Sequence, residues 1–243
     1  MPSVNVNPFY FNLLYAAGSV LNLGSSASTW SVIRNGTNGT LISQTGTAGH
    51  DISIKATPSG RGYQYGVGRS FIAFAGLSAY APNITALQLK LPRVSNSSAS
   101  PLDVIVLEGT AFGGGLGSTL TTSDYNEVDF ATTYSTVSTW PNSTGTQIIT
   151  LNSTAVNDAN TNNNLNIAIV DNDSDYLDVN PSGLAGGSSF VYWDTIDWNK
   201  PGKIALGVTY SSGYSHNVNG VLSANIGSIN GVATGDIGSM NGV

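Results

Sequence analysis

Three aspartates alternate with other residues in the segment Asp171-Asn-Asp173-Ser-Asp175, directly after an apolar run. Carboxylate oxygens on a short loop are the ligands that a hard cation such as Ca²⁺ takes in proteins. The spacing matches the start of an EF-hand loop, but Tyr176 replaces the required glycine and Ser182 replaces the bidentate glutamate. The sequence therefore leaves two interpretations open: a calcium site at Asp171, Asp173 and Asp175, or a solvated acidic turn.

Sugar binding is the second chemistry to consider, because the face of an aromatic ring suits the apolar side of a pyranose. Two tryptophans, Trp140 and Trp198, are the candidates for a glycan-stacking platform. The alternative is ordinary core packing, which is where large aromatic side chains contribute most. Trp140 precedes a turn-forming proline and Trp193 ends an apolar run, and both are usual places for a packed side chain. The wider aromatic set considered is Tyr125, Tyr134, Trp140, Trp193, Trp198 and Tyr214.

Catalytic patterns are weak in this chain. The two histidines, His50 and His216, stand in no nucleophile-elbow or zinc-hydrolase motif. His50 is followed by Asp51, but neighbouring residues on a strand point to opposite faces. The two glutamates, Glu108 and Glu127, are the types that a glycosidase uses, and nothing in their spacing brings them together. The sequence therefore predicts a protein that is not an enzyme.

The elements that must position these residues are strands. Leu87, Leu89 and Leu91 alternate with polar residues, which is the period of a strand with one buried face. Similar runs are separated by clusters of Pro, Gly, Asn or Ser, and no window has a helical period with caps. The pattern predicts an all-β fold, a jelly-roll β-sandwich. Its strands are expected over residues 52–54, 71–74, 84–91, 104–107, 148–151, 165–170, 190–193 and 204–210.

We expect three regions along the chain: an N-terminal arm and hairpin at 1–45, the jelly-roll sandwich at 46–212 and an assembly tail at 213–243. Val4 and Val6 alternate with asparagine, which indicates an extended arm. The run from Trp30 to Ile33 is followed by two Asn-Gly pairs, which predict a hairpin near Ile42.

Composition restricts the partners. Charged residues make up only 9% of the 243 residues, against about 25% in an ordinary soluble domain. The net charge of −6, without any run of Lys or Arg, argues against a nucleic-acid partner. The apolar stretch from Pro8 to Leu21 is interrupted by Asn12 and is shorter than a membrane helix, so no membrane partner and no signal peptide are expected. The chain has no cysteine, which excludes disulfides and thiolate metal sites.

Residues 218–243 repeat with a period of 11, since an apolar residue followed by Asn-Gly-Val occurs three times. Six glycines exclude a helical supercoil, and Asn-Gly favours tight turns. So few apolar side chains cannot offset the entropy of ordering a glycine-rich segment. The tail must therefore lie on its own domain or be held by other chains, and we expect other chains to hold it. The apolar positions expected to make these assembly contacts are Val218, Val221, Ile226, Ile229, Val232, Ile237 and Met240.

Several segments carry a family resemblance. Residues 69–74 and 84–89 resemble the paired strands of galactose-binding-like jelly rolls, found in carbohydrate-binding modules and phage virion proteins. Residues 123–126, Trp140, 148–152 and 173–176 with Pro181 look like the second half of the same module. The Asn-Gly-Val tail resembles short repeats of tail-fibre-like and capsid-associated phage proteins. The resemblance covers about residues 46–210 and the tail, and it implies a fold and a virion context but no catalytic residue.

Together these observations predict a non-enzymatic virion structural protein at the virion surface, a capsid decoration or fibre subunit. Its partners would be copies of itself, as a homotrimer or another homo-oligomer, and other virion proteins. Apart from the calcium hypothesis, no cofactor is expected. Two alternatives stay open: a carbohydrate-binding receptor module of a tail fibre, and a cell-surface or appendage subunit outside any virus.

Overall fold

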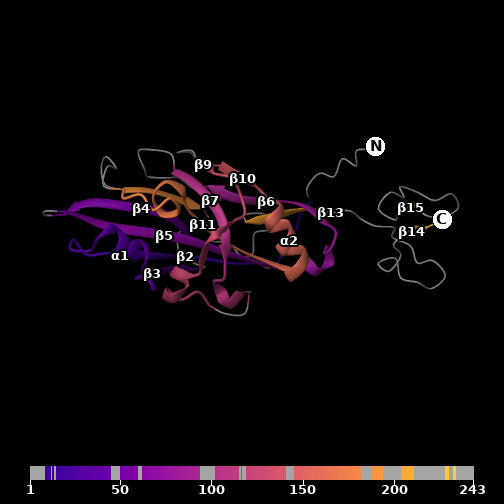
Figure 1. Ribbon diagram of the computed structural model, residues 1–243, viewed down its shortest axis with the longest axis horizontal. Coiled ribbons are helices and arrows are strands. Elements are labelled where there is room, and N and C mark those ends of the chain that lie inside the picture. The colour runs from indigo at the N-terminus through magenta and orange to yellow at the C-terminus, as the bar shows by residue number, and fades with distance from the viewer. Residues whose placement is uncertain are drawn as a thin grey trace.

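The protein consists mainly of antiparallel strands with a few short helices (Figure 1). The computed structural model describes residues 9–11, 13, 15–44, 50–59, 62–93, 102–114, 116, 119–140, 145–181, 188–193, 204–210, 228–229 and 232–233.

All eight predicted strands are present, although β4 has ten residues where three were predicted and β5 has fourteen where four were predicted. The predicted alternation on β6 is confirmed, because Leu87, Leu89 and Leu91 are each fully buried. The eight strands are β4 (His50–Ser59), β5 (Gly62–Ala75), β6 (Ile84–Arg93), β7 (Leu102–Gly109), β10 (Gly145–Leu151), β11 (Asn164–Asp171), β12 (Ser188–Trp193) and β13 (Ala205–Tyr210). The body also contains strands outside these eight predicted runs: β1 (Phe9–Phe11), β2 (Tyr15–Leu23), β3 (Leu41–Gln44), β8 (Val128–Thr133) and β9 (Ser138–Trp140).

The strands form two groups that share one core. In the first group, β6 lies between β13 and β10, and β1 pairs with the far side of β13. In the second, β5 lies between β2 and β11, β7 pairs with β11, and β8 and β9 pair with β7. β4 and β12 connect the groups, because β12 pairs with both β4 and β6. β5 and β6, whose segments resemble paired strands, therefore lie in different groups.

The main core lies between these two groups. Ile72 and Phe74 on β5 belong to the same buried cluster as Leu87 and Leu89 on β6, although β5 and β6 are not paired. Burial of large apolar side chains between two strand layers is the arrangement of a sandwich-like all-β fold.

A second core covers the other face of β5. Val67 and Phe71 on β5 pack in one cluster with Trp30 and Ile33 of the short helix α1 (Trp30–Arg34). Because both faces of β5 are covered, its buried run is continuous from residue 65 to residue 74 instead of alternating.

Two helices correct the sequence analysis, which predicted none. α1 occupies the segment that was predicted as a hairpin, and the Thr29 side chain caps its first turn. α2 (Ser153–Asn162) begins after Asn152, whose Oδ1 accepts hydrogen bonds from the backbone N–H groups of Thr154 and Ala155. Thr and Asn are favoured N-cap residues, so both starts carry a local signal. Four single-turn helices complete the body: η1 (Leu77–Ala79), η2 (Phe112–Gly114), η3 (Thr122–Asn126) and η4 (Asn172–Tyr176).

The described part of the N-terminal region belongs to the sandwich and is not a separate arm. β2 pairs with β5 over nine residues, from Tyr15 opposite Phe74 to Leu23 opposite Gly66, and β3 pairs with β2. The predicted boundary at residue 45 therefore falls between strands of one sheet. Residues 1–8, which include the predicted arm positions Val4 and Val6, lie outside the described residues.

In the tail, β14 (Ser228–Ile229) and β15 (Val232–Ala233) form a two-stranded antiparallel sheet. Ile229 pairs with Val232, so the intervening Asn-Gly dipeptide connects two paired strands, as expected for this turn-forming sequence. Among the described strands, none of the main sheet pairs with this small sheet, and Figure 1 shows β14 and β15 apart from the main body. The tail positions Val218, Val221, Ile226, Ile237 and Met240 lie outside the described residues.

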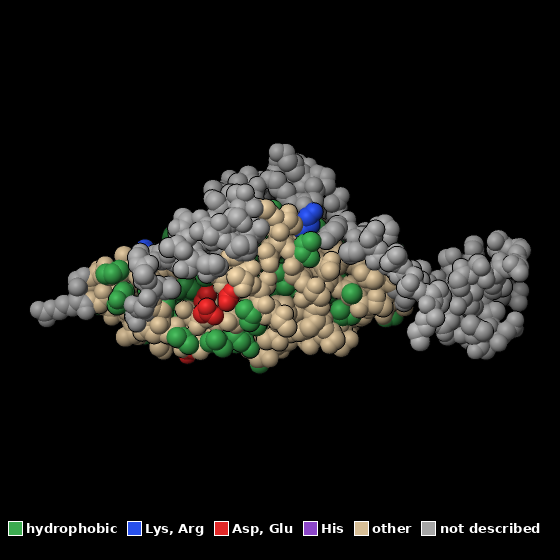
Figure 2. Space-filling view, turned by 90° about the horizontal axis from the view of Figure 1, so that it is seen from above, with side chains coloured by type: hydrophobic (Ala, Val, Ile, Leu, Met, Phe, Trp, Pro, Cys, Tyr) green, Lys and Arg blue, Asp and Glu red, His purple; other side chains and the backbone are tan. Residues whose placement is uncertain are grey.

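The low charge of the sequence is visible on the surface. Figure 2 shows one face on which Lys, Arg, Asp and Glu form a few small groups among uncharged polar atoms and scattered hydrophobic side chains. Among the described helices, none has the length and apolar character needed to cross a bilayer.

Candidate functional site

The most extensive buried polar cluster is centred on Arg69, a fully buried arginine on β5. Its Nε and Nη2 atoms donate to the two carboxylate oxygens of Asp175, each at 2.7 Å, and both side chains are at most 1% exposed. Its Nη1 and Nη2 atoms also donate to the backbone carbonyls of Tyr125 at 2.9 Å and Arg34 at 2.8 Å. A two-pronged ion pair, in which all three guanidinium nitrogens also donate hydrogen bonds, is a favourable environment for a buried arginine.

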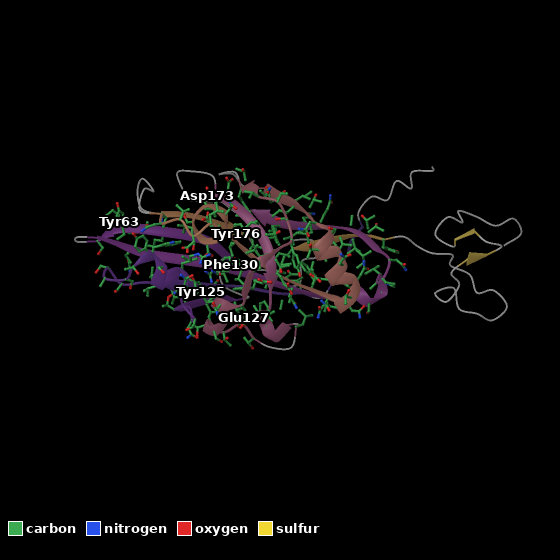
Figure 3. All side chains as sticks on the ribbon, in the orientation of Figure 1. Tyr63, Tyr125, Glu127, Phe130, Asp173 and Tyr176 are labelled. Carbon is green, nitrogen blue, oxygen red and sulfur yellow. The ribbon has the colours of Figure 1, made fainter. Side chains whose placement is uncertain are left out.

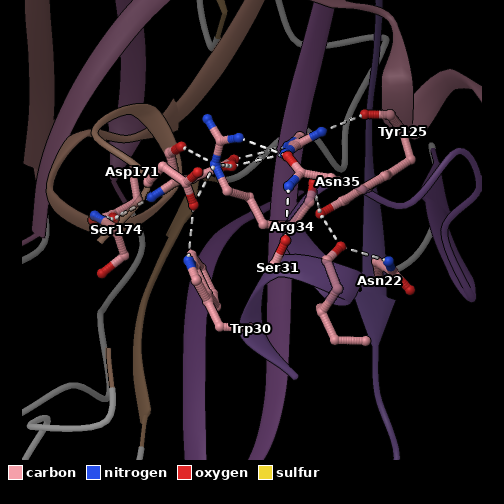
Figure 4. A network of polar contacts seen from close by, with 12 residues as sticks. Asn22, Trp30, Ser31, Arg34, Asn35, Tyr125, Asp171 and Ser174 are labelled. Atoms are coloured by element: carbon pink, nitrogen blue, oxygen red, sulfur yellow. Dashed lines mark hydrogen bonds and ion pairs between the residues drawn. The ribbon is translucent and has the colours of Figure 1, made fainter. Parts of the chain in front are cut away.

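The turn that carries Asp175 is set by Asp171, the last residue of β11. The Oδ1 atom of Asp171 accepts hydrogen bonds from the backbone N–H groups of Ser174 at 2.6 Å and Asp175 at 3.3 Å, and so caps η4 (Figure 4). Burial is the main cause that raises the pKa of the Asp171 carboxyl to about 7, and the hydrogen bonds oppose that rise. Asp171 therefore positions Asp175 for its bond to Arg69.

Helix α1 closes the network from the other side. Arg34 donates from Nε to the backbone carbonyl of Asp175 at 2.7 Å and lies 3.5 Å from the carboxylate of Asp178. The indole nitrogen of Trp30 donates to the same Asp178 carboxylate at 3.2 Å. The guanidinium of Arg34 also stands 4.7 Å from the ring centre of Phe130, within reach of a cation–π contact.

Tyr125 supplies the aromatic wall of the network. Its ring centre is 4.1 Å from the Arg69 guanidinium carbon, and its hydroxyl donates to the backbone carbonyl of Ile33 at 3.0 Å. Burial raises the pKa of Tyr125, so its hydroxyl is a permanent donor near neutral pH. Arg69 and Tyr125 thus join β5, η3 and α1 into one hydrogen-bonded cluster.

The predicted calcium ligands do not converge in this arrangement. Both carboxylate oxygens of Asp175 bind Arg69, and the Asp171 carboxylate caps a helical turn. Asp173 is exposed, accepts a hydrogen bond from the Asn172 side chain and lies near the surface in Figure 3. The described residues contain no group of three or more His, Cys, Asp or Glu side chains placed to hold a metal ion. The geometry therefore gives the calcium hypothesis at this segment no support.

The candidate glycan platform is also not formed by the described aromatic residues. Trp140 is 1% exposed and Tyr134 is 2% exposed, both in the main core, and Tyr125 is fully buried in the Arg69 cluster. A buried ring has no free face for a sugar to stack on. Trp198 and Tyr214 lie outside the described residues, and of Trp193 only the backbone is described.

A second polar cluster lines a small cavity of about 50 Å³ at the end of β7. Its walls come from β7, β11, α2 and the segment after β8. Tyr134 donates its hydroxyl hydrogen bond to Asp158 Oδ2 at 2.7 Å. The lining residues are Glu108, Gly109, Thr110, Tyr134, Asp158, Asn162, Asn164, Leu165 and Asn166.

The electrostatics of this cavity are acidic. Burial, followed by the charges of Asp158 and Asp129, raises the pKa of the Glu108 carboxyl. Burial and the hydrogen bond to Asp158 also raise the pKa of Tyr134. No Lys, Arg or His is among the residues that line the cavity. The carboxylates of Glu108 and Asp158 therefore repel each other, and no cationic side chain in the lining offsets this repulsion.

The two glutamates considered for catalysis occupy different places. Glu108 lines the cavity, whereas Glu127 follows η3, accepts a hydrogen bond from the Thr110 hydroxyl, and does not line it. In Figure 3, Glu127 lies on the opposite side of the body from Asp173, with Phe130 between them. The backbone of His50 belongs to β4, and His216 lies outside the described residues.

No protein-family model and no curated protein matches this chain.

Sequence reasoning missed the partners that matter most in both clusters. Arg69 is a single charge within an apolar strand, and a buried arginine requires an anionic partner, so it carried a usable signal. Asn152 carried the N-cap signal for α2, which brings Asp158 to the cavity. Neighbouring residues in the sequence do not reveal which partner each group meets, because Arg69 and Asp175, for example, are 106 residues apart.

Proposed function

We propose that this protein is a non-enzymatic structural subunit of a virion surface, a capsid decoration or fibre protein that assembles through its C-terminal repeat. Its partners in this proposal are copies of itself, as a homotrimer or another homo-oligomer, and other virion proteins. The finer form of the fold is a jelly roll with an extended tail. The resemblance of the body and tail to phage virion proteins is the basis for the virion context.

The observation that carries the assembly role is the β14–β15 sheet. One copy of the Asn-Gly-Val unit forms a ladder in which Ser228 pairs with Ala233 and Ile229 pairs with Val232, separate from the main sheet. Two-stranded hairpins are marginally stable in water at best, even when longer than this one. The repeat unit therefore adopts a strand-pairing geometry without enough partners within the described chain to stabilise it.

Neighbouring subunits would supply the missing partners. Strand addition provides backbone hydrogen bonds to an exposed edge, and alternate side chains entering pockets provide specificity. In a symmetric homo-oligomer the same repeat from each subunit can pair around the axis, so three tails would bury their apolar positions against one another.

The body offers a receiving edge of suitable character. β3 pairs with β2 alone among the described strands, so its other side is an open edge. Leu41 and Ile42 on this edge are 56% and 42% exposed. An open edge with exposed apolar side chains invites pairing with another strand unless it is covered. β3 therefore supports contacts between subunits in addition to the tail.

Deletion of residues 217–243 tests the proposal. We expect the truncated protein to keep its β-sheet circular-dichroism spectrum and cooperative unfolding, while its mass by light scattering falls from that of an oligomer to that of a monomer. An oligomer of unchanged mass after truncation would contradict the assembly role of the tail.

Paired substitutions refine this test. Ile229→Ser with Val232→Ser removes the apolar side chains of the pairing unit and should shift the equilibrium toward monomers. The matched control is Val137→Ser with Ile148→Ser, which removes two apolar side chains that are 46% and 50% exposed on the body. An equal loss of oligomer in both double variants would mean that general surface hydrophobicity, and not the repeat, holds the assembly.

A further inference from the structure

The open edges of the described sandwich are not equally protected against pairing with another strand. Natural sheets protect an edge by a very short strand, a charged side chain, a bulge or coverage by another element. β1 and β9 have three residues each. β8 carries the exposed side chain of Asp129, and its pairing with β7 shifts register. β10 is joined to β9, because Gln147 Nε2 donates to the Ser138 hydroxyl at 2.8 Å.

The edge strand β3 has none of these features. It contains four uncharged residues, Leu41–Gln44, and pairs with β2 alone among the strands that the structure describes. An edge strand directs alternate backbone N–H and C=O groups away from its partner, and these groups can bond to an added strand. Extended backbone is therefore the chemistry that this edge recognises.

The side chains of β3 indicate what the added strand must carry. Ile42 lies opposite Val20 on β2, and Val20 is fully buried in the second core. Side chains directly opposite each other share one face of a sheet, so Ile42, which is 42% exposed, lies on the face that carries the second core. An apolar side chain placed beside Ile42 would extend that core. The matching occupant is therefore an uncharged strand with an apolar, β-branched side chain.

The tail has these properties. Residues 211–243 contain a single Asp, Glu, Lys or Arg residue, Asp236. Ile229 and Val232 are both β-branched and stand opposite each other in the β14–β15 ladder. Within the described part of the chain, β14 and β15 pair only with each other. A neutral contact also suits two copies of a chain with a net charge of −6, whose charged surfaces repel each other.

We propose that β3 is the receiving site of the tail: the β14–β15 unit of one copy adds to β3 of a neighbouring copy, with Ile229 or Val232 beside Ile42. This site rests on the proposed function, because it names the surface that the assembly tail meets. It differs from an arrangement in which the tails pair only with one another. A head-to-tail contact of this kind gives a closed ring, such as a trimer, when the rotation between copies closes.

Disulfide formation between engineered cysteines tests this pairing, since the natural chain has no cysteine. Ile42→Cys marks β3, and either Ile229→Cys or Val232→Cys marks the tail. The β3 variant is co-expressed with each tail variant in turn, with an affinity tag on one of the two chains. After mild oxidation we expect a disulfide-linked heterodimer with at least one of the tail variants.

The matched control for the β3 variant is Ile148→Cys. Ile148 belongs to the edge strand β10, and its side chain is 50% exposed. With the same tail variants it should form at least about tenfold less heterodimer, because a disulfide requires two Cα atoms within about 7 Å of each other.

The other outcomes contradict the site, and they separate its failure from that of the assembly role. Disulfides only between two tail cysteines mean that the tails pair with one another, and disulfides only between two Ile42→Cys chains mean that β3 pairs with itself. An oligomer that deletion of residues 217–243 dissociates, but that forms no disulfide between β3 and the tail, contradicts this site alone. A monomeric unmodified protein contradicts the assembly role as well.

A charge on the edge provides an independent measurement. Ile42→Lys places an ammonium group beside the added strand, and lysine on an edge opposes pairing. By analytical ultracentrifugation we expect at least about tenfold weaker association, whereas Ile148→Lys, with the same change in net charge, should leave association unchanged. Equal association of the Ile42→Lys variant and the unmodified protein would overturn the site. If Ile42→Lys loses its β-sheet circular-dichroism spectrum, the disulfide experiment decides.

Discussion

The two polar clusters of this protein differ in how completely their groups are paired. Around Arg69, the donors of the guanidinium meet the Asp175 carboxylate and two backbone carbonyls. In the β7 cavity, two carboxylates share a lining that contains no cationic side chain. Paired groups stabilise a fold, whereas two like charges without a cationic partner do not. The segment with the more suggestive sequence, Asp171–Asp175, is therefore the structural cluster.

The largest effect should come from opening the closed cluster. Arg69→Met leaves the Asp175 carboxylate buried without its partner, and we expect a loss of about 3–5 kcal/mol in the free energy of unfolding. Urea-induced unfolding followed by tryptophan fluorescence measures the change.

The double variant Arg69→Met with Asp175→Leu sharpens this prediction. Replacing both partners of a buried pair by apolar residues is often close to neutral, so the second substitution should restore a large part of the loss. Restoration would be incomplete because the backbone carbonyls of Tyr125 and Arg34 each lose the hydrogen bond from Arg69. If Arg69→Met alone were as stable as the unmodified protein, the Arg69–Asp175 pair would not contribute to the stability of the fold.

An intermediate effect concerns pH. Because burial raises the pKa of Asp171 to about 7, the folded protein binds this proton more tightly than the unfolded chain, whose aspartates have a pKa of about 3.9. The stability from this group is therefore complete below about pH 4, decreases as the pH rises, and reaches its lower limit above about pH 7.

Asp171→Asn isolates that contribution, because the amide oxygen still accepts from the N–H groups of Ser174 and Asp175. The melting temperature of the variant relative to the unmodified protein should rise between pH 4 and pH 7. A difference that stays constant over this range would show that Asp171 has an ordinary pKa in the folded protein.

The smallest effect should come from the cavity. Glu108→Gln removes one of two repelling charges, and we expect the free energy of unfolding to stay within about 0.5 kcal/mol or to increase slightly. Thermal and urea unfolding both measure this change. A loss above about 1 kcal/mol would mean that Glu108 is a structural group and that the two clusters are alike.

Local patterns were sufficient for most of the strands. The alternation of Leu87, Leu89 and Leu91 and the other apolar runs gave all eight predicted strands, because side-chain burial on a strand follows a period of two. The helices were missed since α1 has only five residues and α2 is weakly apolar, with Ala155 and Ala159 as its buried residues. Their caps, Thr29 and Asn152, were the available signals.

The aspartate segment shows why spacing alone was misleading. An alternating pattern places three carboxylates together only if the backbone forms the expected loop. Here the segment turns into η4, so Asp171 caps the turn, Asp173 is exposed and Asp175 points inward to Arg69. The choice between these conformations depends on Arg69, which no pattern within the segment reveals.

The sequence by itself determined the all-β class, the positions of the main strands, the weakly charged surface and the repeat of the tail, because composition and short-range periodicity encode these properties. Only the tertiary structure decided that Arg69 meets Asp175 and that Glu108, Asp158 and Asn166 line one cavity. Such contacts join residues on different strands and helices, and the order and register of those elements are set by how the whole core packs.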